Sequence, residues 1–147
     1  EQSHPGNGAR ETADALAELF SARIDHVVRV DFKGFETFID ALGSIDLDVE
    51  RTFTDYEYPT LDYKWQKVSF EKGRQHMDGA TALKFVRSRH GNNGEGNDFA
   101  RNARQQKVFL AVKNKLLSRG TLLNPQRLMK LYEEVAKTSK RTCRLGP

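Results

Sequence analysis

Residues 26–49 place a strand pattern, a helix pattern and a second strand pattern in immediate succession, and this order constrains the fold most strongly. The segment 26–32 is rich in β-branched residues, which favour strands. Apolar residues then recur at helical spacing over 35–42, and Gly43 is placed to end that helix. Residues 45–49 alternate between apolar and acidic, as a half-buried strand does. Two strands joined through a helix form a crossover unit, so we predict an α/β sheet.

Helical spacing and capping residues predict four further helices. They are residues 8–22, a helix that Asp78 caps and that ends near Arg87, the longest helix from Asp98 to about Ser118, and a last helix begun by Asn124 and Pro125. The longest helix has an inward stripe of Val108, Val112 and Leu116, and the last has a buried side of Leu128, Leu131, Tyr132 and Val135. At 147 residues the chain suits a single domain, residues 1–147, with a basic tail at 138–147.

The segments between these helices are harder to assign. Residues 52–66 scatter aromatic side chains among Asp, Glu, Pro and Thr without a steady period, so we expect a long loop, with a short hairpin as the alternative. Residues 68–70 are predicted to be a short strand and 71–74 a turn. The connector 91–96 holds three glycines but matches no nucleotide-binding fingerprint, and we expect it to be flexible.

Charge is distributed unevenly along the chain. From Asp98 to the C-terminus twelve Lys or Arg residues face three Asp or Glu residues, whereas residues 1–97 carry twelve against seventeen. The basic C-terminal third suits an anionic polymer, surface or membrane headgroup. Exposed aromatics are not interleaved with these basic residues, so we expect no specific nucleic-acid binding. No apolar run is long enough to span a membrane, and no export signal is evident.

Common catalytic and metal-binding patterns find no support in the sequence. The four histidines fall in unrelated contexts, and the single cysteine, Cys143, lies in the polar tail. A Ser/His/Asp or Cys/His arrangement and a structural zinc site therefore lack their residues.

Arginines instead gather around the glycine-rich connector. Arg87 and Arg89 precede it, and Arg101 and Arg104 follow it at the start of the longest helix. A guanidinium pairs two donors at a time with phosphate oxygens, and a helix start adds free N–H groups. We predict a site for a phosphate-like anion, with ordinary solvated arginines as the alternative.

The geometry of this cluster sets a condition on the fold. Asp98, Arg101 and Gln105 lie at i, i+3 and i+7 and share one face of a helix. On a continuous helix Arg87 and Arg89 would diverge by about 200°. The helix must therefore end near Arg87 if both are to face one ligand.

Four stretches of the chain resemble the LytR-CpsA-Psr family of cell-envelope proteins. They are residues 25–43, 70–83, 86–89 and 98–106, and they follow the family's order within about residues 8–136. The resemblance implies a three-layer α/β/α sandwich, of which this chain would be the C-terminal portion. The family's upstream block, with its aspartates and further arginines, is expected before Glu1, and the spacing from Arg89 to Asp98 is longer than usual.

The resemblance also implies a function. Such proteins are extracytoplasmic phosphotransferases, anchored at the outer face of the bacterial membrane by an N-terminal helix. They move a glycopolymer from a polyprenyl-pyrophosphate carrier to peptidoglycan, with Mg²⁺ whose ligands we expect upstream of Glu1. We expect the present stretch alone to be inactive in transfer. The alternatives are a non-catalytic module that binds polyprenyl phosphate or an anionic polymer, and a nucleic-acid-binding regulator, which no helix-turn-helix pattern supports.

Site residues carry over from the family position by position. Arg87, Arg89, Arg101 and Gln105 would bind the pyrophosphate, and Asp98 and Arg101 would be catalytic, with Asp98 orienting an arginine. The lipid tail of such a carrier needs an apolar channel beside the arginines. The side chains expected to wall it are Leu83, Val86, Phe109 and Val112.

Overall fold

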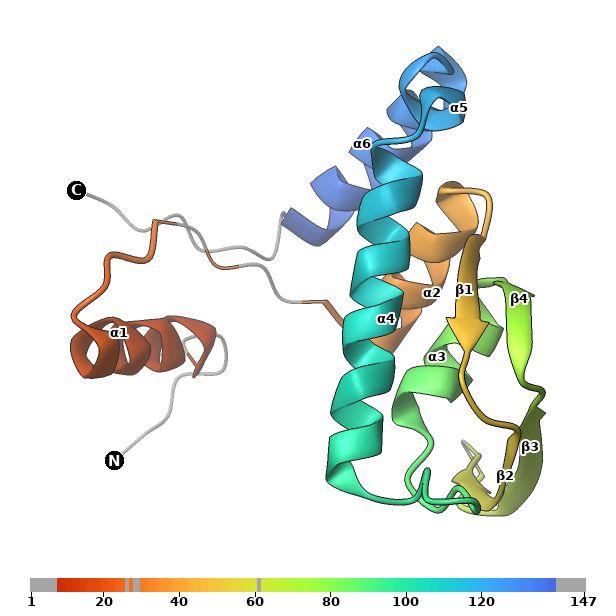
Figure 1. Ribbon diagram of the computed structural model, residues 1–147. Coiled ribbons are helices and arrows are strands. Elements are labelled where there is room, and N and C mark those ends of the chain that lie inside the picture. The colour runs from red at the N-terminus through yellow and green to blue at the C-terminus, as the bar shows by residue number, and fades with distance from the viewer. Residues whose placement is uncertain (1–7, 26, 28–29, 61, 140–147) are drawn as a thin grey trace.

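The computed structural model describes residues 8–25, 27, 30–60 and 62–139 (Figure 1). In chain order the elements are α1 (Gly8–Phe20), α2 (Phe32–Ala41), β1 (Ile45–Val49), β2 (Phe53–Pro59), β3 (Trp65–Phe70), β4 (Gly73–Met77), α3 (Gly79–Arg87), α4 (Asp98–Leu116), α5 (Arg119–Leu122) and α6 (Pro125–Ser139). The five helices predicted from apolar spacing are confirmed, and the short α5 was not anticipated. None of the helices in these ranges is long and apolar enough to cross a membrane.

The strands form two antiparallel pairs. β1 pairs with β4, with Ile45 opposite Met77 and Val49 opposite Gly73. β2 and β3 form a hairpin whose register shifts between Asp55 and Tyr58. The short hairpin considered for segment 52–66 is therefore present and extends to Phe70, and the long loop was wrong. Half of the predicted turn at 71–74 is also strand, because β4 begins at Gly73, whereas residues 71 and 72 lie between β3 and β4.

The predicted crossover unit does not appear among the described residues. His26, Val28 and Arg29 of its first strand lie outside the described residues, and the neighbouring residues that are described belong to no strand. At the end of that segment Asp31 caps α2 instead, because its carboxylate accepts a hydrogen bond from the Gly34 N–H at 2.7 Å. The second strand of the unit, β1, is confirmed with the expected alternation, but its partner is antiparallel.

The core lies between α4, β1, α3 and the hairpin. α4 packs on β1 and on α3, and α2 packs on α3. Figure 1 shows α4 running past the strands, with α5 and α6 following near its far end. Three rings tie the hairpin to α3, since the centroids of Phe53 and Phe70 lie 5.0 Å apart and those of Phe70 and Phe85 lie 5.1 Å apart. Such tilted ring pairs stabilise the core beyond the contribution of their buried apolar area.

The buried faces predicted for α4 and α6 were confirmed to different extents. On α4, Val108 is buried and Val112 packs against the core, as predicted. On α6, Leu131 is buried, but Leu128 is 42% exposed and Tyr132 is 71% exposed. The predicted buried side of α6 was therefore too wide, because this helix packs mainly on α2 and α5. The side chain of Val135 lies outside the described part.

Candidate functional site

Helix α3 ends at Arg87, as the arginine spacing required. The amide of Ser88 still donates to the Lys84 carbonyl at 3.0 Å, but Ser88 itself has φ −54° and ψ 130°, which leaves the helical region. Arg87 therefore closes the helix, whereas Arg89 lies beyond its end. The divergence expected on a continuous helix no longer applies to this pair.

A buried carboxylate on β2 receives the backbone after this break. The side chain of Asp55 is 1% exposed, and its Oδ2 accepts hydrogen bonds from Ser88 Oγ at 2.6 Å, Arg89 N at 3.1 Å and His90 N at 3.2 Å. Its Oδ1 accepts from Glu57 N at 2.9 Å. Burial alone raises the pKa of this carboxyl, but the four hydrogen bonds outweigh burial and lower its pKa. Asp55 is therefore an anion that holds the backbone of residues 89 and 90 and the side chain of Ser88.

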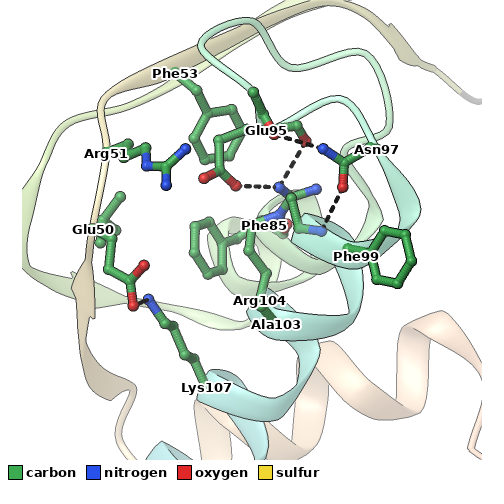
Figure 2. Close-up of a pocket in the computed structure, with 13 residues that line it drawn as sticks. Glu50, Arg51, Phe53, Phe85, Glu95, Asn97, Phe99, Ala103, Arg104 and Lys107 are labelled. Carbon is green, nitrogen blue, oxygen red and sulfur yellow. Dashed lines mark hydrogen bonds and ion pairs between the residues drawn. The ribbon is translucent and has the colours of Figure 1, made fainter.

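A buried arginine on α4, drawn beside Glu95 in Figure 2, also binds the end of α3. Arg104 is 3% exposed, and it donates from Nε to the Phe85 carbonyl at 3.0 Å and from Nη2 to the Ser88 carbonyl at 2.6 Å. Its Nη1 pairs with Glu95 Oε2 at 2.6 Å, and the guanidinium lies 5.0 Å from the centre of the Phe53 ring. The charge is thus compensated by Glu95, and Arg104 serves the protein's own backbone.

Arg87 and Arg89 have different surroundings. The Arg87 guanidinium is half-buried, stacked 4.0 Å from the Phe32 ring centroid and 3.4 Å from the Tyr58 hydroxyl. Burial raises the pKa of Tyr58, with nearby Arg87 opposing that effect. The Arg89 side chain is exposed, and no described residue forms an ion pair or hydrogen bond with its guanidinium. Arg89 therefore has its donors available for an anion.

The candidate residues on α4 share one flank of that helix. Arg101 pairs with Asp98, with 2.9 Å between Nη2 and Oδ1, so an acidic side chain orients this arginine. Gln105 is exposed and lies one turn further along. Arg104 ties this end of α4 to the end of α3 through its hydrogen bonds to Phe85 and Ser88. The described structure records no direct contact between the two arginines at the end of α3 and Arg101, so their joint binding of one ligand stays a prediction.

The residues proposed as a channel wall occupy two environments. Leu83 is buried, and Val86 and Val112 pack against the core, whereas Phe109 is 70% exposed. None of these four residues lines the cavity beside Arg104 and Lys107. A channel at this place also stays a prediction.

A cavity of about 310 Å³ opens on another flank of α4 (Figure 2). It is lined by Val49, Glu50, Arg51, Phe53, Phe85, Gly94, Glu95, Asn97, Phe99, Ala100, Ala103, Arg104 and Lys107. Lys107 pairs with Glu50 at 2.5 Å, and Figure 2 shows the Arg51 guanidinium turned toward the cavity. Sequence patterns missed this cavity because its lining comes from β1, the hairpin, α3, the connector and α4.

The glycine-rich connector is held against β2. The Asn92 amide donates to the Thr54 carbonyl at 3.0 Å, and the Asn92 Oδ1 accepts from Thr54 N at 2.8 Å. Asn93 Nδ2 donates to the Thr52 carbonyl at 2.8 Å. The connector that we expected to be flexible therefore has ordered contacts. Asn93 and Gly94 provide the left-handed conformations of its turn, with φ of 55° and 83°.

The residues that the structure describes do not fit a Mg²⁺ site. Within the described ranges no three His, Cys, Asp or Glu side chains group so that they could hold a metal ion. Asp55 is fully engaged by donors, and Asp98 is paired with Arg101. The magnesium implied by the resemblance would need ligands from elsewhere.

The fold is that of an α/β protein with arginines at and just after the end of helix α3. The sequence profile of the LytR-CpsA-Psr family matches residues 2–144, and the chain belongs to this family. The α/β fold class predicted from the resemblance is confirmed by solved structures of family members.

Two solved structures illustrate the match. The crystal structure of Bacillus subtilis TagV aligns with a TM-score of 0.66 and 29% identity, covering 89% of this chain and 46% of that one. The LytR-Csp2A-Psr enzyme from Actinomyces oris aligns with a TM-score of 0.59 and 27% identity, covering 77% and 42%.

Similar sequences act in the cell wall according to their names. The cell wall biosynthesis protein LcpA of Corynebacterium glutamicum is 30% identical over 89% of this chain and 23% of its own length. The polyisoprenyl-teichoic acid–peptidoglycan teichoic acid transferase TagV of Bacillus subtilis is 30% identical over 91% of this chain and 33% of its own length. The chain thus spans a third or less of these two relatives.

Proposed function

We propose that this chain is the pyrophosphate-binding portion of a phosphotransferase that moves a glycopolymer from a polyprenyl-pyrophosphate carrier to peptidoglycan. Family membership and the name of the TagV relative support the reaction class. The observation that carries the proposal is the exposed guanidinium of Arg89, which no described residue engages and which lies two residues after Arg87, beyond the end of α3. We further propose that the protein works at the outer face of the membrane, held there by a membrane anchor.

The chemistry needs what these side chains offer. Phosphoryl transfer spreads negative charge over oxygens, and catalysis comes mainly from neutralising that charge and from positioning the groups. Arg89 can present two donors to one phosphate group. The Arg87 guanidinium lies over the rings of Phe32 and Tyr58, and these ring faces fix its plane.

We assign secondary roles to residues of α4. Asp98 holds Arg101 by the ion pair, so Arg101 can act on the phosphate oxygens as the charge develops, and Gln105 can add an uncharged donor. Leu83, Val86, Phe109 and Val112 are proposed to meet the lipid tail. Since the first of these is buried and two others pack on the core, a tail would have to part α3 and α4 locally.

A titration with three probes tests this function. Geranyl pyrophosphate, the longer farnesyl pyrophosphate and a random DNA duplex are titrated into the 147-residue chain between about 50 and 200 mM salt. We expect farnesyl pyrophosphate to bind more tightly than geranyl pyrophosphate and to persist in salt, because burial of methylene groups is not screened. Indifference to tail length together with tight, salt-sensitive duplex binding would contradict the proposal.

A further inference from the structure

The end of α3 replaces a helical hydrogen bond with two bonds to side chains. If the helix continued, the amide of Arg89 would donate to the Phe85 carbonyl, four residues earlier. In the structure the Phe85 carbonyl accepts from Arg104 Nε at 3.0 Å, and the Arg89 amide donates to Asp55 Oδ2 at 3.1 Å. The Phe85 carbonyl is therefore satisfied by a cationic side chain, and the Arg89 amide by an anionic one.

Ser88 is held by both of these side chains. Its hydroxyl donates to Asp55 at 2.6 Å and its carbonyl accepts from Arg104 at 2.6 Å. Ser88 is completely buried, as are nearly all atoms of Asp55 and Arg104. Since hydrogen bonds to charged groups are stronger than neutral ones, these contacts can outweigh another helical turn.

The two side chains come from distant parts of the sequence. Asp55 belongs to the hairpin and Arg104 to α4, so the break in α3 is imposed by tertiary packing rather than by a glycine or proline at the helix end. Asp55 also accepts from the His90 amide at 3.2 Å, which extends its hold over the residue after Arg89.

We propose that Asp55 and Arg104 are positioning residues that stop α3 at Arg87 and thereby set the directions of Arg87 and Arg89 for a pyrophosphate group. This role rests on the proposed function for its ligand, whereas the helix stop itself does not. Without the stop, α3 could continue through Ser88 and Arg89, and the two guanidinium groups would separate by about 200° around the helix axis.

The key variants weaken the stop without deleting an arginine of the site. Asp55→Asn keeps the shape of the side chain but removes its charge, and Ser88→Ala removes one bond to Asp55. Asp78→Asn is the matched control, because Asp78 caps the other end of the same helix by accepting from Thr81 N at 2.8 Å. It should lower stability through α3 without touching the break.

Two measurements on the full chain are needed. The first is the ¹³Cα chemical shifts of Ser88, Arg89 and His90, which distinguish helical from extended backbone. The second is the dissociation constant for farnesyl pyrophosphate. For Asp55→Asn we expect these shifts to move toward helical values and the affinity to fall about tenfold, which is the loss of one charge-assisted contact. Ser88→Ala should show both changes to a smaller degree, and it decides the matter if Asp55→Asn does not fold.

The control separates positioning from general stability. We expect Asp78→Asn to lower the unfolding midpoint while leaving these chemical shifts and the affinity unchanged. Unchanged shifts and affinity in both Asp55→Asn and Ser88→Ala would overturn the inference. If the wild-type chain does not bind farnesyl pyrophosphate, the proposed function fails, and the chemical shifts alone then uphold or refute the helix stop.

Discussion

Replacing the carboxylate of Asp55 by an amide should cost stability in a pH-dependent way. The carboxylate is buried and accepts four hydrogen bonds, three of them at Oδ2. In Asp55→Asn one oxygen is lost as an acceptor and the charge disappears. Bonds to charged groups contribute about 1.5–3 kcal/mol each and are not additive, so we expect a loss of about 3 kcal/mol in the free energy of unfolding at neutral pH.

The sign of the pH dependence follows from the lowered pKa. Because the pKa of Asp55 in the folded protein lies below its ordinary value of 3.8, the unfolded chain binds the proton first as the pH falls. The stability contributed by the carboxylate is complete above 3.8 and is lost as the pH drops through the folded pKa. The variant cannot titrate at this position, so its difference from wild type should shrink only in that acidic window.

Urea unfolding followed by circular dichroism measures this difference. Wild type and Asp55→Asn are compared at neutral pH and at several values below 3.8. Asp46 and Asp78, whose pKa values are also lowered, titrate in both proteins and cancel in the comparison. A difference that stays constant into strong acid, or a variant as stable as wild type at neutral pH, would refute the reasoning.

Three further predictions concern packing and binding. Gly79→Ala should destabilise by about 1–3 kcal/mol in urea unfolding, because a Cβ there would lie 2.1 Å from the Glu36 carbonyl oxygen, whereas Gly120→Ala in α5 has open space and should be neutral or stabilising. Phe85→Ala should cost about 3–5 kcal/mol in the same assay, because this buried ring contacts two others, and a cost below 1 kcal/mol would contradict the ring cluster. Arg89→Lys should bind farnesyl pyrophosphate detectably but more weakly than wild type in calorimetry, because lysine keeps the charge and loses the fork, and full affinity would indicate a simple electrostatic patch.

Local patterns predicted most of the fold. Apolar spacing placed the helices correctly, and Asp78 was recognised as the cap of α3. Strand pairing was less accessible, since the alternation of β1 does not reveal whether its partner runs parallel or antiparallel. The hairpin at 53–70 was obscured because a register shift between Asp55 and Tyr58 interrupts the alternation that marks a strand.

The residues of the candidate site were likewise predicted only in part. The arginines were found because their types and spacing are local features of the sequence. Asp55 was missed because it looks like one more acidic residue in a polar segment. Arg104 was grouped with the arginines expected to face an anion, although it is buried and donates hydrogen bonds to the protein backbone. Arg104 contacts Ser88, 16 positions away in the chain, and Asp55 contacts Arg89, 34 positions away. No local sequence pattern encodes contacts at such distances.

The central claim is that Arg87 and Arg89 form a pyrophosphate site, and calorimetry with farnesyl pyrophosphate tests it most directly. Arg87→Ala and Arg89→Ala should each weaken binding by about 1.5–3 kcal/mol, as the loss of charge-assisted hydrogen bonds does. Arg119→Ala is the control, an exposed arginine on α5 whose loss removes the same charge and should change little. Equal losses in all three variants would show that diffuse basic charge holds the ligand, and would contradict a defined site at the end of α3.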